Sequence, residues 1–206
     1  NGYNVFTVTF APFQTLRCLD QIKVDLAYSN IKVTMTGLAS GLINGPLGNT
    51  HCCIEDVGAL RSIPNLTIVS PADGVGIVKA VFASAESDQP IYIRLSGGSN
   101  NPIVYHDDID FQIGKAIEIE TGNDLTIFAT GTMVFYSLQA AKILAQKGIS
   151  ASVWDMHTIK PIDETALRKA ADKNKLIVTV EEHNVFGGLS SAVAEYLSSY
   201  KSDSSQ

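Results

Sequence analysis

Residues 66–95 read LTIVSPADGVGIVKAVFASAESDQPIYIRL, and this stretch decides the fold class. A run rich in β-branched residues, Leu66–Ser70, comes first, then a segment of helical character, Asp73–Glu86, and then a second β-branched run, Ile91–Leu95. Strands that alternate with helices are typical of βαβ units, in which neighbouring strands are parallel. The stretch therefore predicts an α/β protein with a parallel sheet.

The same alternation extends to both sides of this unit. Upstream we expect strands at Tyr3–Phe10 and Ile31–Thr36, one helix that starts at Pro12 and carries apolar residues to Leu26, and a short helix at Ile54–Ile63. Downstream, after residues 96–102 interrupt the periodicity, we expect strands at Lys115–Glu120, Leu125–Thr130, Ala151–Asp155 and Leu176–Val180, and helices at Thr132–Gln146, Asp163–Asn174 and Gly188–Leu197. We therefore predict two small three-layer α/β domains with mostly parallel sheets, residues 1–102 and 103–206.

Composition excludes several classes of protein. The chain has 206 residues, 45% of them apolar and 17% charged, which is enough to bury a core. The net charge of −6 provides no basic surface for nucleic acid, and the apolar stretch Val75–Ala85 is short and contains Lys79, so no membrane span is expected. Cys18, Cys52 and Cys53 form neither a disulfide framework nor a zinc pattern, so we expect a reducing, cytoplasmic environment and no metal site.

Candidate functional residues follow the ends of the predicted strands in the first half. In open parallel sheets, ligands bind beyond the carboxyl ends of the strands. Phe10 and Phe13 lie at the first such end, His51 follows a glycine-rich loop after the second, and Arg94 ends the fourth. Aromatic rings suit a flat heterocycle, histidine suits proton transfer and arginine suits a phosphate. Alternatively, Phe13 belongs to the core, His51 is a solvated loop residue and Arg94 pairs with an acidic residue.

Several motifs resemble those of transketolases. The stretches TFAPF at 9–13, GPLGNTH at 45–51 and RSIPN at 61–65 resemble the pyrimidine-binding domain, and GTM at 131–133, KPID at 160–163 and VEEH at 180–183 resemble the C-terminal domain. The matches run in the same order over nearly the whole chain, so the chain is identified as a member of this superfamily. The same two-domain unit occurs in 1-deoxyxylulose-5-phosphate synthase and in the β subunits of 2-oxo acid dehydrogenases.

This resemblance implies thiamine diphosphate as cofactor and transfer of a two-carbon ketol unit between sugar phosphates as the reaction. It implies that Phe10 and Phe13 hold the aminopyrimidine ring, that His51 bonds the reacting oxygens and moves protons, and that Arg94 binds the substrate phosphate. The two related enzyme classes, which act on 2-oxo acids, are the alternatives. Leu47 stands where transketolases usually carry an acid that contacts a sugar hydroxyl, which leaves a non-catalytic assembly module as a further alternative.

The family also implies partners for this chain. In transketolases, the glutamate that protonates the aminopyrimidine lies upstream of the first strand, and a separate domain binds the diphosphate and Mg²⁺. We therefore expect this chain to be the C-terminal part or subunit of an enzyme, inactive without the diphosphate-binding domain or subunit, and to form a homodimer. The acidic cluster Glu181–His183 is expected to be structural, at a strand end or an interface.

Overall fold

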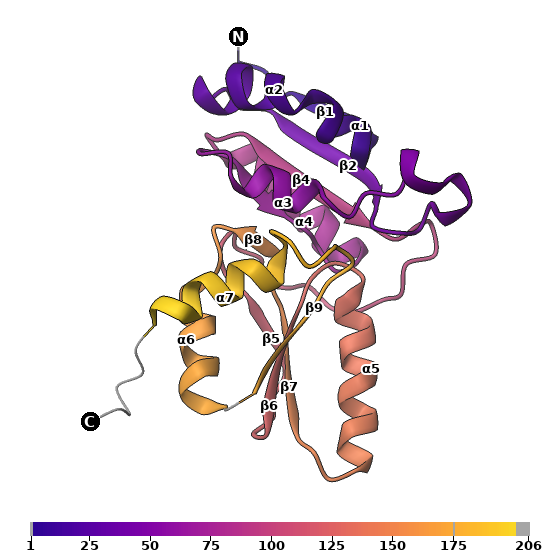
Figure 1. The fold of residues 1–206 in the computed structure, drawn as a ribbon, viewed down its shortest axis with the longest axis vertical. Coiled ribbons are helices and arrows are strands. Elements are labelled where there is room, and N and C mark those ends of the chain that lie inside the picture. The colour runs from indigo at the N-terminus through magenta and orange to yellow at the C-terminus, as the bar shows by residue number, and fades with distance from the viewer. Residues whose placement is uncertain (1, 175, 201–206) are drawn as a thin grey trace.

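The computed structural model describes residues 2–174 and 176–200 and contains two sheets, one above the other in Figure 1. The upper sheet has the strand order β1-β2-β4-β3-β8. These strands are β1 (Phe6–Phe10), β2 (Thr34–Ser40), β4 (Ile91–Ser96), β3 (Thr67–Val69) and β8 (Thr158–Lys160). The first four are parallel, whereas β8 pairs antiparallel with β3.

The lower sheet has the order β5-β7-β6-β9. It is built from β5 (Ile117–Glu120), β7 (Ala151–Asp155), β6 (Leu125–Ala129) and β9 (Ile177–Val180). Only the edge strand β5 is antiparallel to its neighbour. The prediction of an α/β fold with two mostly parallel sheets is therefore confirmed.

Helices of ordinary geometry connect the strands. They are α3 (Asp56–Arg61) and α4 (Gly74–Glu86) in the first half, and α5 (Met133–Gln146), α6 (Glu164–Lys173) and α7 (Leu189–Ser199) in the second. In two of them the N-cap residue itself provides the cap: Asp73 accepts a hydrogen bond from the Gly76 amide, and Asp163 accepts from the Thr165 and Ala166 amides. These caps satisfy amides that a helix leaves unpaired at its start.

The chain between β1 and β2 is not the single regular helix that its apolar spacing predicts. Four short pieces replace it: α1 (Ala11–Gln14), the 3₁₀ turn η1 (Leu16–Cys18), α2 (Leu19–Gln21) and η2 (Ile22–Tyr28), which has π-helical hydrogen bonding. The first break is at Thr15, whose φ and ψ are −114° and −80° and whose hydroxyl donates to the Ala11 carbonyl at 2.7 Å. This local hydrogen bond competes with the regular helix pattern.

Strand β2 is shifted along the chain from its predicted range. It starts at Thr34, opposite Phe6 of β1, and continues to Ser40. Gly37 lies within this strand. The position suits glycine because a Cβ there would clash with the Tyr92 side chain of β4. The shift carries the strand closer to the glycine-rich loop that follows.

Strand β8 was missed by sequence reasoning and joins the two halves of the chain. Its three residues lie beside β3, with Ile68 opposite Lys160. The Lys160 ammonium donates to the carbonyl of Arg61 at 3.0 Å and to that of Ile63, which follows α3 on the upper sheet. Figure 1 shows β8 at the junction, so the second half supplies an edge strand to the first sheet.

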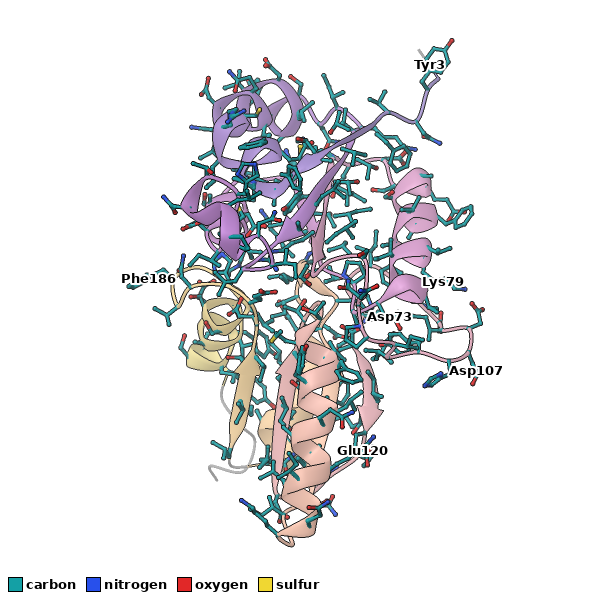
Figure 2. All side chains as sticks on the ribbon, turned by 90° about the vertical axis from the view of Figure 1, so that its right-hand side faces the viewer. Tyr3, Asp73, Lys79, Asp107, Glu120 and Phe186 are labelled. Atoms are coloured by element: carbon teal, nitrogen blue, oxygen red, sulfur yellow. The ribbon has the colours of Figure 1, made fainter. Side chains whose placement is uncertain are left out.

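Side chains of the first half also hold the segment that connects the two halves. One Asp73 oxygen accepts the Val104 and Tyr105 amides at 2.8 Å each, and Lys79 of α4 lies 2.6 Å from Asp108. Figure 2 shows Asp73 where the connection meets α4 and Asp107 on its outer bend. The acidic residues of this segment therefore belong to a solvent-exposed connection that is anchored at α4.

Candidate active site

Three of the predicted site residues form an aromatic cluster at the carboxyl end of β1. Phe10 ends the strand, Phe13 belongs to α1, and His51 follows the 3₁₀ segment η3 (Gly45–Thr50). The His51 ring centroid lies 5.4 Å from that of Phe10 and 5.2 Å from that of Phe13, and the two phenyl rings are 6.3 Å apart. All three pairs are edge-to-face, an arrangement that aromatic rings favour.

The loop of residues 41–53, called the His51 loop below, brings the histidine to this cluster. It leaves β2 at Gly41, which has φ +82°, and its two ends are tied together. The Gly41 amide donates to the Cys53 carbonyl at 2.7 Å, and the Cys53 amide donates to the Gly41 carbonyl at 2.9 Å. Near the tip, the Thr50 hydroxyl lies 2.9 Å from His51 Nδ1 and orients the ring.

Arg17 is a member of this cluster that sequence reasoning did not single out. Its guanidinium carbon lies 4.0 Å from the centre of the Phe13 ring, and the residue is exposed. A guanidinium over a phenyl face is a stabilising cation–π contact. The i, i+4 spacing from Phe13 was the available signal, because residues four apart share one face of a helix.

Arg94 does not join the cluster. Its side chain is 2% exposed, and Nε lies 2.9 Å from Asp56 Oδ2. Its Nη2 donates to the carbonyls of Cys53 at 3.2 Å and Glu182 at 2.9 Å. Since a buried guanidinium with these partners has no face open to a ligand, the geometry argues against the expected role as a phosphate anchor and supports the alternative of an internal ion pair.

A buried polar network surrounds this ion pair. Asp56 is fully buried and also accepts a hydrogen bond from the Tyr92 hydroxyl at 2.7 Å. Burial raises the pKa of Tyr92, and the Asp56 charge raises it further. Burial acts to lower the pKa of Arg94, but the adjacent carboxylate of Asp56 outweighs it, so that this pKa lies above its usual value. Arg94 is therefore a permanent internal cation.

The acidic cluster after β9 holds the backbone of neighbouring elements. Glu181 accepts the Leu189 and Ser190 amides at 2.7 and 2.8 Å and so caps α7. Glu182 accepts the Leu42 amide at 2.8 Å. His183 Nε2 accepts the Gly58 amide of α3 at 3.3 Å. These hydrogen bonds agree with the prediction that the cluster is structural and lies at a strand end.

The aromatic cluster is open to a flat ring of the kind expected from the sequence, the aminopyrimidine of thiamine diphosphate. Phe10 is 38% exposed, and Phe13 and His51 are partly exposed, so a flat heterocycle can reach their faces. Leu47 is 55% exposed on the same loop as His51.

Within residues 2–174 and 176–200, no three His, Cys, Asp or Glu side chains are grouped so as to bind a metal ion. None of the helices described there has the length and apolar character needed to span a bilayer.

Comparison with protein families agrees with these features. Residues 1–101 match the pyrimidine-binding domain of transketolase, and residues 114–204 match the transketolase C-terminal domain. The chain belongs to the transketolase family. Residues 102–113, which connect the two halves, lie between the two matched ranges.

Individual relatives cover the chain almost completely. It is 42% identical over 198 residues to an apulose-4-phosphate transketolase subunit from Phocaeicola vulgatus, covering 96% of this chain and 64% of that protein. It is 32% identical to the 1-deoxy-D-xylulose-5-phosphate synthase of Halothermothrix orenii over 88% of this chain and 28% of that protein. A solved structure described as a split gene transketolase in an inactive beta4 tetramer has a TM-score of 0.87 and 38% identity, with 95% of this chain and 63% of that one covered. The chain thus spans less than two thirds of the length of each.

Proposed function

We propose that this member of the transketolase family contributes the pyrimidine-binding half of a thiamine diphosphate-dependent active site. In this proposal a separate diphosphate-binding domain or subunit, which also supplies the Mg²⁺ site, completes the enzyme. The assembled enzyme transfers a two-carbon ketol unit between sugar phosphates. The observation that carries the proposal is the cluster of Phe10, Phe13 and His51, whose ring centroids lie within 6.3 Å of one another at a strand end.

The residues of the cluster divide the work between binding and proton transfer. Phe10 and Phe13 would hold the aminopyrimidine through their ring faces, and Arg17 fixes the orientation of Phe13. The bound cofactor would supply a ring that accepts electrons during carbon–carbon bond cleavage. His51, held by Thr50, would donate hydrogen bonds to the substrate's oxygens and exchange protons with them. Arg94 has no part in this proposal, because its side chain is buried and its Nε and Nη2 donors are paired inside the protein.

A 1-deoxyxylulose-5-phosphate synthase-like reaction is the second candidate. It shares the cofactor but starts from a 2-oxo acid, and the relative from Halothermothrix orenii supports it at 32% identity. The higher identity to a protein named as a transketolase component favours ketol transfer. Leu47 bears on the choice of sugar, since an apolar side chain cannot contact a hydroxyl as an acid does.

Reconstitution tests the proposal. The chain is mixed with the diphosphate-binding subunit, thiamine diphosphate and Mg²⁺, and turnover of xylulose 5-phosphate with an aldose phosphate is compared with turnover of pyruvate with glyceraldehyde 3-phosphate. We expect the first reaction only from the complete mixture. Turnover of pyruvate with glyceraldehyde 3-phosphate, without turnover of xylulose 5-phosphate, would favour the second candidate. A stable complex without either activity would identify a non-catalytic assembly module.

We further infer that the chain associates through the exposed side of the first sheet. The edge strand β1 presents Phe6 and Val8, which are 39% and 60% exposed. An apolar edge of this kind promotes association, which supports a homodimer of the assembled enzyme.

Three free cysteines support a reducing compartment such as the cytoplasm.

A further inference from the structure

The C-terminal half contacts the base of the His51 loop through one side chain. Glu182, two residues after β9, accepts the Leu42 amide with Oε1 at 2.8 Å. A Cβ on the preceding residue, Gly41, would clash with the Glu182 carboxyl group. The backbone of the loop therefore lies directly against the carboxylate, and the φ of +82° at Gly41 favours glycine at that point.

The other end of the loop is tied to the same residue. Arg94 Nη2 donates both to the Cys53 carbonyl at 3.2 Å and to the Glu182 carbonyl at 2.9 Å. Two residues further along, the Asn184 amide and side-chain nitrogen donate to the Ile54 carbonyl at 3.0 and 2.8 Å. Residues 182–184 thus hold both ends of the loop. The Glu182 side chain accepts the Leu42 amide at one end, and the Glu182 carbonyl is linked through Arg94 to the Cys53 carbonyl at the other.

Apart from the Gly41–Cys53 bridge and the hydrogen bonds of its own turns, few contacts constrain the loop. Leu42, Leu47 and Thr50 are exposed, and Gly45 and Gly48 add backbone freedom. Because the loop is short of packed side chains, its position relative to the Phe10 and Phe13 rings depends on how its ends are held.

We propose that Glu182 is a positioning residue that fixes the His51 loop against the aromatic cluster. The inference rests on the proposed role of His51, and it assigns the C-terminal half a part in the active site of the first half. Glu182 acts through the backbone of the loop and does not touch the reacting atoms. The feature that matters is an acceptor oxygen within reach of the Leu42 amide.

Three substitutions of Glu182 separate the effect of the acceptor oxygen from the effect of the charge, and a control variant accounts for general loss of stability. Glu182→Gln keeps an oxygen at the same reach without the charge, Glu182→Asp keeps the charge but shortens the side chain, and Glu182→Ala removes both. Glu195→Ala is the matched control, because Glu195 pairs with Arg61 across the same two halves but away from the loop. Each variant is studied by amide hydrogen exchange of residues 41–53 and by thermal unfolding. Values of kcat and KM are measured in the enzyme assembled with its diphosphate-binding subunit.

We expect Glu182→Ala and Glu182→Asp to speed exchange at Leu42 and to lower kcat about tenfold or more, with KM for the sugar changed much less. Glu182→Gln should stay near the wild type, and Glu195→Ala should leave loop exchange unchanged. Unaltered exchange in both Ala and Asp variants, or a Gln variant as defective as Ala, would overturn the inference. If the wild-type assembly shows no ketol transfer, the proposed function fails, and the exchange data still decide whether Glu182 holds the loop.

Discussion

Arg94 Nε lies 2.9 Å from Asp56 Oδ2, and the two side chains are 2% and 0% exposed. Asp56 begins α3 and Arg94 lies on β4, so the pair connects a helix to the centre of the first sheet. Through Nη2 the same guanidinium reaches Glu182 of the second half. An ion pair in this position holds together the helix, the sheet and the other half of the chain.

Removal of the guanidinium should destabilise the protein. In Arg94→Met, the buried Asp56 carboxylate loses its counter-charge, and breaking one side of such a pair costs about 3–5 kcal/mol of unfolding free energy. Urea unfolding measures the loss, and Arg168→Met, at an exposed arginine on α6, is the control. The double variant Arg94→Met/Asp56→Asn should recover part of the loss. A stable Arg94→Met protein with a raised KM for the phosphorylated substrate would instead restore the phosphate-anchor role.

Loss of a ring from the aromatic cluster should weaken cofactor binding. Phe13→Ala removes a stacking surface and the contact with Arg17, and an aromatic contact contributes about 1 kcal/mol, so the Kd for thiamine diphosphate should rise about fivefold or more. Titration of the assembled enzyme with cofactor measures this change. Phe82→Ala is the control, because Phe82 is 69% exposed on α4. Equal Kd values for Phe13→Ala and the wild type would remove Phe13 from the cofactor site.

The sequence predicts most of the fold because hydrophobic periodicity is a local signal. Segments such as Asp73–Glu86 and Ile91–Leu95 form their expected structures within a residue or so. The three residues of β8 carry too short a pattern, and their partner Ile68 lies about ninety residues away. The broken segment after β1 depends on the local hydrogen bond of Thr15, which apolar spacing does not reveal.

The site could be predicted in part for a similar reason. Phe10, Phe13 and His51 follow strand ends, and strand ends meet at one edge of a parallel sheet. The environment of Arg94 depends on Asp56, 38 residues earlier, and on Glu182, 88 residues later. A strand-end arginine has the same local pattern whether it binds a ligand or an internal carboxylate, so the sequence could not separate these two roles.

Asp155 should make the protein less stable as the pH rises. Burial raises the pKa of Asp155 to about 7 and outweighs the hydrogen bond from the Tyr105 hydroxyl at 2.8 Å, which acts to lower it. Because the folded-state pKa lies above the unfolded value, the stabilisation is complete below the unfolded pKa and is lost as the pH rises through about 7. Between pH 5 and 8 the wild type should lose roughly 2 kcal/mol relative to Asp155→Asn, which cannot ionise.

Urea unfolding of both proteins across this pH range measures the difference. Asp107→Asn, at an exposed carboxylate of the connection, should follow the wild type. Parallel pH profiles for the wild type and Asp155→Asn would show that Asp155 is already ionised in the folded protein at pH 5.

His157, two residues further along, should have the opposite effect. Its ring stacks on Phe111 with centroids 4.1 Å apart, and its Nδ1 lies 2.9 Å from the Thr158 hydroxyl. Burial lowers the pKa of His157 to about 4. The folded-state pKa lies below the unfolded value, so the stabilisation is present above the unfolded pKa and is lost as the pH falls through about 4.

His157→Phe should therefore flatten the acid side of the stability profile, because a phenyl ring keeps the stack on Phe111 and cannot be protonated. On going from neutral pH to pH 5, protonation of His157 should lower the free energy of unfolding of the wild type by roughly 2 kcal/mol. His157→Phe should not show this loss. His106→Gln, at an exposed histidine, is the control and should retain the wild-type profile. A ring-carbon proton signal of His157 that titrates near its ordinary pKa in the folded protein would refute the expected neutral, buried state.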